Sequence, residues 1–138
     1  MIVVDTNVIS EVMRPRPSPS VLSWLNAQDG NQLFITTVTL AEVGYGLGIL
    51  PVGQRRWQLH RRFEKFIAQA FEERVLDFTA AAARAYAEIM AHRKEVGGPM
   101  SLPDGQIASI AHARGFALAT RNIKDFEDCG LELINPFE

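Results

Sequence analysis

Apolar residues open the chain and stop at a carboxylate. Residues 2–4 are Ile-Val-Val, and Asp5 follows them directly. A short continuous run of apolar, β-branched residues is typical of a strand that is buried on both faces of a parallel sheet. We therefore predict a central strand at the start of the chain, with Asp5 at its carboxyl end. In open α/β sheets this edge is where ligands bind.

Further short apolar runs alternate with longer segments of helical periodicity. The later predicted strands are 33–36, 74–78, 116–120 and 131–134. The predicted helices are 7–13, a second from Ser18 or Ser20 to the turn at Asp29, 38–50, 54–71, 80 to 94 or 96, and 103–114. This alternation predicts a single domain over 1–138, a three-layer α/β/α fold with a mostly parallel sheet of four to five strands.

Individual residues mark the ends of these helices. Thr79 is a natural N-cap, and Gly115 occupies the position after a helix end where glycine is favoured. Gly44, Gly46 and Gly48 weaken the 38–50 helix. They indicate either close packing of another backbone or a loose helix end.

Composition and net charge narrow the expected binding partners and cellular compartment. The 138 residues are 47% hydrophobic, which suffices for a core, and the net charge of -2 gives no overall attraction to nucleic acid or an anionic membrane. A polyanion would have to be held locally. The lone cysteine, Cys129, excludes an internal disulfide framework, and no apolar run reaches membrane-spanning length. We expect a cytoplasmic protein with no membrane association.

Four acidic residues are predicted to meet at one sheet edge. Asp5 ends the first strand, Glu42 lies early in the helix after 33–36, and Asp104 opens a later helix. Asp125 follows the 116–120 strand. Carboxylates held a few ångströms apart repel, and a divalent cation removes the repulsion. An all-oxygen set of ligands suits Mg²⁺ or Mn²⁺ rather than zinc.

Each acid also has a simpler interpretation. Asp5 alone could cap the next helix, and Asp125 could be a solvated loop acid. Glu42 and Asp104 each lie three residues after a Thr or Ser, so each could close a capping box. An aspartyl-phosphate mechanism needs a second acid two residues after the first, where this chain has Asn7. The joint placement of the acids favours a metal site.

One segment, 55–65, concentrates basic residues. On sequence alone, a solvated helix face with arginine stems over the core explains it best. The functional alternative is a surface that binds RNA phosphates or an acidic partner. The candidate contacts to RNA or a protein partner are Arg55, Arg56, Arg62 and Arg121.

Four motifs resemble those of PIN-domain proteins, above all the VapC/FitB toxins of type II toxin–antitoxin systems. They occur in the same order and cover essentially the whole chain. They are Val-Val-Asp5-Thr6-Asn7, Thr-Leu-Ala-Glu42-Val, Pro-Asp104-Gly-Gln-Ile-Ala and Ala-Thr120-Arg121-Asn122-Ile-Lys-Asp125-Phe. The resemblance implies metal binding and catalysis by Asp5, Glu42 and Asp104. Asn122 stands where FitB-like members carry Asp, so Asp125 is expected to complete the acidic set. The residues expected to orient water and ligands around the metal are Thr6, Asn7, Thr120 and Asn122.

The resemblance also implies an activity and partners. The expected activity is Mg²⁺- or Mn²⁺-dependent endoribonuclease cleavage by metal-activated water, with Asp104 or Asp125 helping to deprotonate that water. The expected partners are a second copy in a homodimer and a cognate antitoxin, both contacting the helices around 38–72, with operator DNA bound only through the antitoxin. The alternative is a non-catalytic PIN-like module that binds protein or nucleic acid, and the amide at Asn122 keeps it open.

Overall fold

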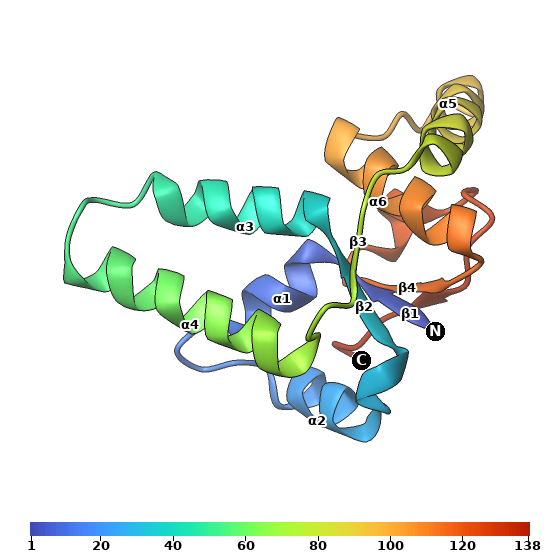
Figure 1. Ribbon diagram of the computed structural model, residues 1–138. Coiled ribbons are helices and arrows are strands. Elements are labelled where there is room, and N and C mark those ends of the chain that lie inside the picture. Colours follow the sequence, from blue (N-terminus) through green and yellow to red (C-terminus); the bar gives the residue numbers. More distant parts are fainter.

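β1 (Ile2–Val4) is the central strand of a five-stranded sheet in the computed structural model, which describes all 138 residues. The other strands are β2 (Leu33–Thr36), β3 (Val75–Leu76), β4 (Ala117–Ala119) and β5 (Leu133–Ile134). Their order is β3-β2-β1-β4-β5, and every neighbouring pair is parallel. The predicted three-layer α/β/α fold is confirmed, with a sheet that is parallel throughout (Figure 1).

The helices fall close to their predicted ranges. They are α1 (Thr6–Val12), α2 (Pro19–Ala27), α3 (Thr37–Gly48), α4 (Gln54–Ala70), α5 (Ala80–Glu95) and α6 (Leu102–Arg114), with short 3-10 helices at Gly30–Gln32 (η1) and Ile123–Phe126 (η2). Thr79 caps α5 and Gly115 ends α6 in the left-handed conformation, as predicted. Ser18, rather than Ser20, caps α2. None of the helices is long and apolar enough to cross a membrane.

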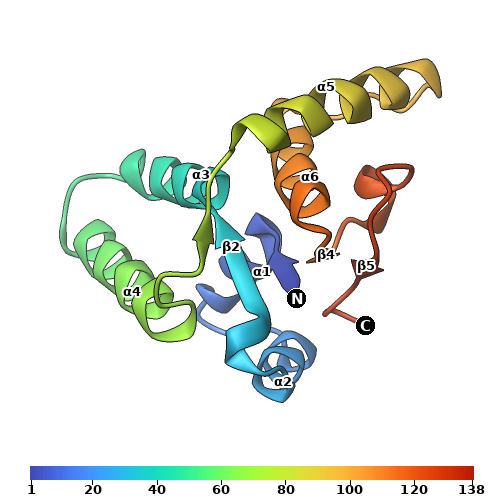
Figure 2. The same ribbon diagram turned by 45° about the vertical axis from the view of Figure 1, so that its right-hand side comes forward.

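Two apolar cores lie on opposite faces of the sheet because successive strand residues point in opposite directions. Val3 packs with residues of α5 and α6, including Ile89 and Ile107. Val4 packs with residues of α1, α2 and α4, including Ile9 and Phe63. The two helix layers are visible on either side of the sheet in Figure 2.

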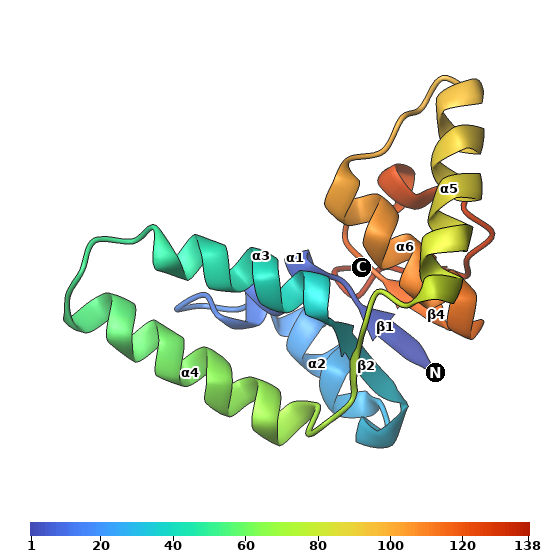
Figure 3. The same ribbon diagram turned by 45° about the horizontal axis from the view of Figure 1, so that its top comes forward.

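α3 and α4 form a hairpin that extends away from the sheet, as Figures 1 and 3 show. A Cβ atom added at Gly44, Gly46 or Gly48 would meet nothing within 4 Å. The predicted close packing of another backbone is therefore wrong within this chain. α3 ends at Gly48, which agrees with the alternative of a loose helix end.

The sheet order reverses between β1 and β4. β1 leads through α1 and α2 to β2 on one side, while β4 pairs with β1 on the other. Val4 lies opposite Ala119, and the Asp5 N–H donates to the Ala119 carbonyl at 2.9 Å. This reversal opens a crevice at the carboxyl ends of the strands, where ligands bind in open α/β sheets. The fold therefore places Asp5 and Thr120 side by side in that crevice.

Candidate active site

Asp5 lies at the bottom of the crevice and is only 4% exposed. One carboxylate oxygen accepts a hydrogen bond from the Thr6 N–H at 2.8 Å, and the other accepts one from the Thr120 hydroxyl at 2.8 Å. Asp5 is also the N-cap of α1. Capping is thus part of its role, but a cap alone does not require burial beside other acids.

Burial raises the pKa of Asp5 to about 6. The hydrogen bonds from Thr120 and Thr6 act in the opposite direction, and the nearby charges of Asp104 and Glu42 add to the rise. Burial and like charges both disfavour the ionised carboxylate. The fold therefore holds Asp5 at a free-energy cost that a bound cation would relieve.

The Thr120 hydroxyl connects Asp5 with two of the residues expected to support the site, Asn7 and Asn122. While donating to Asp5, it accepts hydrogen bonds from the Asn7 side-chain amide at 3.2 Å and the Asn122 N–H at 3.1 Å. The Asn7 side-chain oxygen in turn accepts from the Arg121 N–H at 3.2 Å. This network fixes the turn after β4 against the start of α1 and orients the Asp5 carboxylate.

Glu42 is held by a second polar cluster. Its carboxylate accepts a hydrogen bond from the Thr6 hydroxyl at 2.8 Å, and that hydroxyl lies 2.9 Å from the Thr39 hydroxyl. Thr36, not Thr39, caps α3, so the capping-box interpretation of Glu42 is wrong. Thr36 and Thr39 are both fully buried. Sequence reasoning did not assign them to the site, although a polar residue at the end of β2 was a signal.

Asp104 enters the crevice from the first turn of α6. Its N–H donates to Ser101, the N-cap, at 3.3 Å, so the capping interpretation holds in part. Burial raises the pKa of Asp104, and the charges of Asp125 and Glu42 contribute to the rise. Asp104 is therefore a half-buried acid near three others.

A polar cavity of about 480 Å³ lies among these side chains, and none of its lining residues is hydrophobic. Its lining residues are Asp5, Thr6, Asn7, Ser10, Glu11, Arg14, Glu42, Asp104, Arg121 and Asn122. Three of the four predicted acids line it. Asp125 lies in η2 outside the lining, close enough for its charge to act on Asp104, while Asn122 lines the cavity directly.

Sequence reasoning missed part of one face of α1. Asn7, Ser10, Glu11 and Arg14 all line the polar cavity. The Ser18 N–H donates to one carboxylate oxygen of Glu11 at 2.9 Å, and Arg14 is ion-paired with the other at 3.1 Å. The hydrogen bond from Ser18 and the charge of Arg14 both lower the pKa of Glu11. The spacing i, i+3, i+4 places Asn7, Ser10 and Glu11 on one face of α1, and Arg14 follows just after the helix ends at Val12. That polar stripe was the available signal.

The donor atoms fit a hard divalent cation. Every side chain that the cavity presents for coordination ends in oxygen or a carboxamide, as Mg²⁺ and Mn²⁺ prefer. No three acidic, His or Cys side chains are already arranged as a closed metal site.

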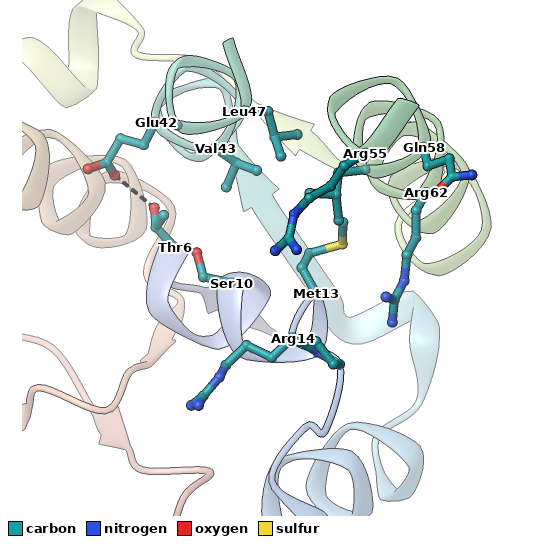
Figure 4. A pocket seen from close by; sticks show the side chains of 13 residues that line it. Thr6, Ser10, Met13, Arg14, Glu42, Val43, Leu47, Arg55, Gln58 and Arg62 are labelled. Atoms are coloured by element: carbon teal, nitrogen blue, oxygen red, sulfur yellow. Dashed lines mark hydrogen bonds between the residues drawn. The ribbon is translucent and has the colours of Figure 1, made fainter. Parts of the chain in front are cut away.

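The predicted basic contacts separate into three places. Arg121 lines the polar cavity. Arg55 and Arg62 line a neighbouring cavity between α1, α3 and α4, shown in Figure 4. Arg56 lines neither. The sequence grouped Arg55 with Arg56, but adjacent helix residues point about 100° apart.

A family model described as PIN domain matches residues 2–130. The chain belongs to the PIN-domain family. This PIN domain is 44% identical over its whole length to "VapC ribonuclease Y4jK" of Sinorhizobium fredii, covering 99% of that protein. It is 34% identical over 99% of its length to "Toxin FitB" of Neisseria gonorrhoeae, again covering 99% of the relative. The resemblance to VapC/FitB proteins is confirmed.

Solved structures agree with this assignment. The PIN domain superposes on a chain of "Structure of FitAB bound to IR36 DNA fragment" with a TM-score of 0.93 and 34% identity, covering all of this chain and 96% of that one. A chain of the VapBC2 complex from Rickettsia felis, bound to a DNA fragment from its promoter, gives a TM-score of 0.84 at 28% identity, with 98% of both chains covered. Both are structures of complexes with DNA.

Proposed function

We propose that this PIN domain is a Mg²⁺- or Mn²⁺-dependent endoribonuclease and the toxin of a type II toxin–antitoxin pair. One observation carries the proposal. Asp5, Glu42 and Asp104 line one polar cavity at the reversal of the sheet, in a chain whose full-length relatives include proteins named VapC ribonuclease and toxin FitB. The antitoxin and DNA partners are proposed from the solved complexes of similar chains.

Asp5, Glu42 and Asp104 would hold the cation. Bound there, it would polarise the scissile phosphodiester and make the attacking water more acidic. The chain's own hydroxyls set the direction of two of these carboxylates, since Thr120 donates to Asp5 and Thr6 donates to Glu42. Without those donors each carboxylate could rotate away from the position in which it binds.

Either Asp104 or Asp125 would accept a proton from the attacking water. Asp125 remains our proposed fourth acid because its charge acts on Asp104 from the neighbouring loop. Arg14 and Arg121 line the same cavity, and their positive charges would attract the phosphodiester to an otherwise acidic site.

Partners would bind on the α3–α4 hairpin. Four of its large apolar side chains are exposed to solvent: Tyr45, Ile49, Val52 and Trp57. A cluster of this kind on a small domain marks an interaction surface. We propose that it serves the homodimer and the antitoxin, and that the antitoxin supplies the contacts to operator DNA.

The direct test is cleavage of total cellular RNA by purified protein freed of antitoxin. We expect discrete cuts in Mn²⁺ that are lost in EDTA and in the Asp5→Asn variant, with 5′-phosphate and 3′-hydroxyl ends. A 2′,3′-cyclic phosphate would instead indicate attack by the ribose. Folded protein that binds Mn²⁺ but cuts no RNA would favour the alternative of a non-catalytic binding module, which the Asn122 amide in the cavity lining keeps open.

A further inference from the structure

A second cavity adjoins the polar cavity and is built differently. It has a volume of about 580 Å³, within the range of pockets that bind small organic molecules. Thr6, Ser10, Arg14 and Glu42 line both cavities, so the two lie next to each other. A flexible strand with one phosphate beside the acids would therefore have its next nucleotide close to this second space.

The walls of the second cavity combine apolar and cationic groups. Val43 and Leu47 of α3 and Met13 at the end of α1 form its apolar wall. Figure 4 shows these three side chains pointing into the space, with Arg55 reaching from α4 toward them and Arg62 lying along the same helix. The base of a nucleotide would fit against the apolar wall, and its phosphate would pair with the arginines.

Two of the four arginines of α4, Arg55 and Arg62, line this cavity and lack acidic partners. The salt bridges in the structure are Glu11–Arg14 and Glu72–Arg74, and neither includes Arg55 or Arg62. Arg62 makes one long hydrogen bond, 3.5 Å, to the Val12 carbonyl. In a chain of net charge -2, unpaired arginines gathered at one cavity point to an anionic ligand.

We propose that the cavity between α1, α3 and α4 is a subsite for a nucleotide of single-stranded RNA next to the scissile phosphate, with Arg55 and Arg62 binding its phosphates. This inference rests on the proposed ribonuclease function and adds the place where the substrate is held. An acidic peptide would pair with the arginines but would make no use of the adjoining acid-lined cavity. Single-stranded RNA uses both features, since its bases are unstacked and free to enter an apolar pocket.

The test measures binding of a short fluorescein-labelled single-stranded RNA by anisotropy, in EDTA, over a range of salt concentrations. Arg55→Gln and Arg62→Gln should each weaken binding and reduce the slope of log K against log salt by about 0.7 for each phosphate that the variant no longer binds. Arg56→Gln is the matched control because it removes the same charge from the same helix outside the cavity. Its slope should equal that of the wild type.

Two results would overturn the subsite. Equal slopes for all three variants would mean that α4 attracts RNA only as a diffuse charged surface. Unchanged RNA binding, together with loss of the copurifying antitoxin in Arg55→Gln and Arg62→Gln, would assign the cavity to the protein partner. EDTA prevents cleavage during the binding assay, so this assay tests the subsite alone. Failure of the ribonuclease proposal would appear instead in the Mn²⁺ cleavage experiment.

Discussion

At the scale of single residues, Asp5 shows how the fold prepares a carboxylate. It is buried, it receives two hydrogen bonds, and it lies near two other acids. The hydrogen bonds keep it oriented, whereas burial and the neighbouring charges favour its protonated form. Without a cation, the folded state should therefore bind a proton here more tightly than the unfolded chain does.

The pH dependence of stability follows from that difference. In EDTA, the pKa of Asp5 is 3.8 in the unfolded chain and about 6 in the folded one. The folded state binds more protons in this range, so this group lowers the free energy of unfolding as pH rises from about 4 to about 6. Relative to Asp5→Asn, the wild type should lose about 2 kcal/mol across this window in urea denaturation. Parallel pH curves for the two proteins would contradict this account.

Residues at strand ends were predictable, whereas residues placed by turns were not. A contiguous apolar run determines where a buried strand stops, which located Asp5 in advance. The position of Asp125 depends instead on Arg93, which is 7% exposed and donates to the carbonyl oxygens of Asp125 and Glu127 at 2.7 and 3.0 Å. A side chain more than thirty residues away fixes this loop, and no local pattern indicates it.

At the scale of elements, the packing of α5 against α6 positions Asp104. Gly105, the next residue, is buried, and a Cβ atom there would lie 3.0 Å from Tyr86 and closer still to Met90. The missing side chain lets α5 approach the first turn of α6. Periodicity predicted both helices, but it could not show that this glycine sits at their contact.

Gly105→Ala should destabilise the protein by about 1–3 kcal/mol because it overpacks this contact. It should also lower RNA cleavage by displacing Asp104. Gly44→Ala is the matched control, since the added methyl group meets open space in the helical part of α3. That variant should gain about 0.5–1 kcal/mol. Thermal melting of both variants decides the matter, and a loss of stability of similar size in each would contradict the packing argument.

At the scale of the whole molecule, the α3–α4 hairpin contributes to the proposed active site on one side and offers a surface for a partner on the other. Its inner side contributes Glu42, Arg55 and Arg62 to the two cavities. Its exposed apolar residues, including Tyr45 at 71% and Ile49 at 66%, are available to a partner. Sequence predicted contacts over 38–72, but the projection of the hairpin from the sheet became evident only in the structure (Figure 3).

The proposed dimer should depend on this surface. We expect the wild type to be a dimer in light scattering after size-exclusion chromatography, and Ile49→Lys to shift it to monomer by placing a charge in an apolar contact. Val96→Lys is the control, because Val96 is similarly exposed at the end of α5, away from the hairpin. A monomeric wild type, or a dimer unaffected by Ile49→Lys, would rule out this interface.

The central claim is that the acids at the sheet reversal hold a divalent cation. Calorimetric titration of Mn²⁺ into antitoxin-free protein, above the pKa of Asp5, tests it most directly. The wild type should bind Mn²⁺, and Asp5→Asn should lose that binding. Asp77→Asn should retain it, since Asp77 also follows a strand but lies outside the cavity lining. Absence of binding in the wild type, or equal binding by Asp5→Asn, would contradict the account.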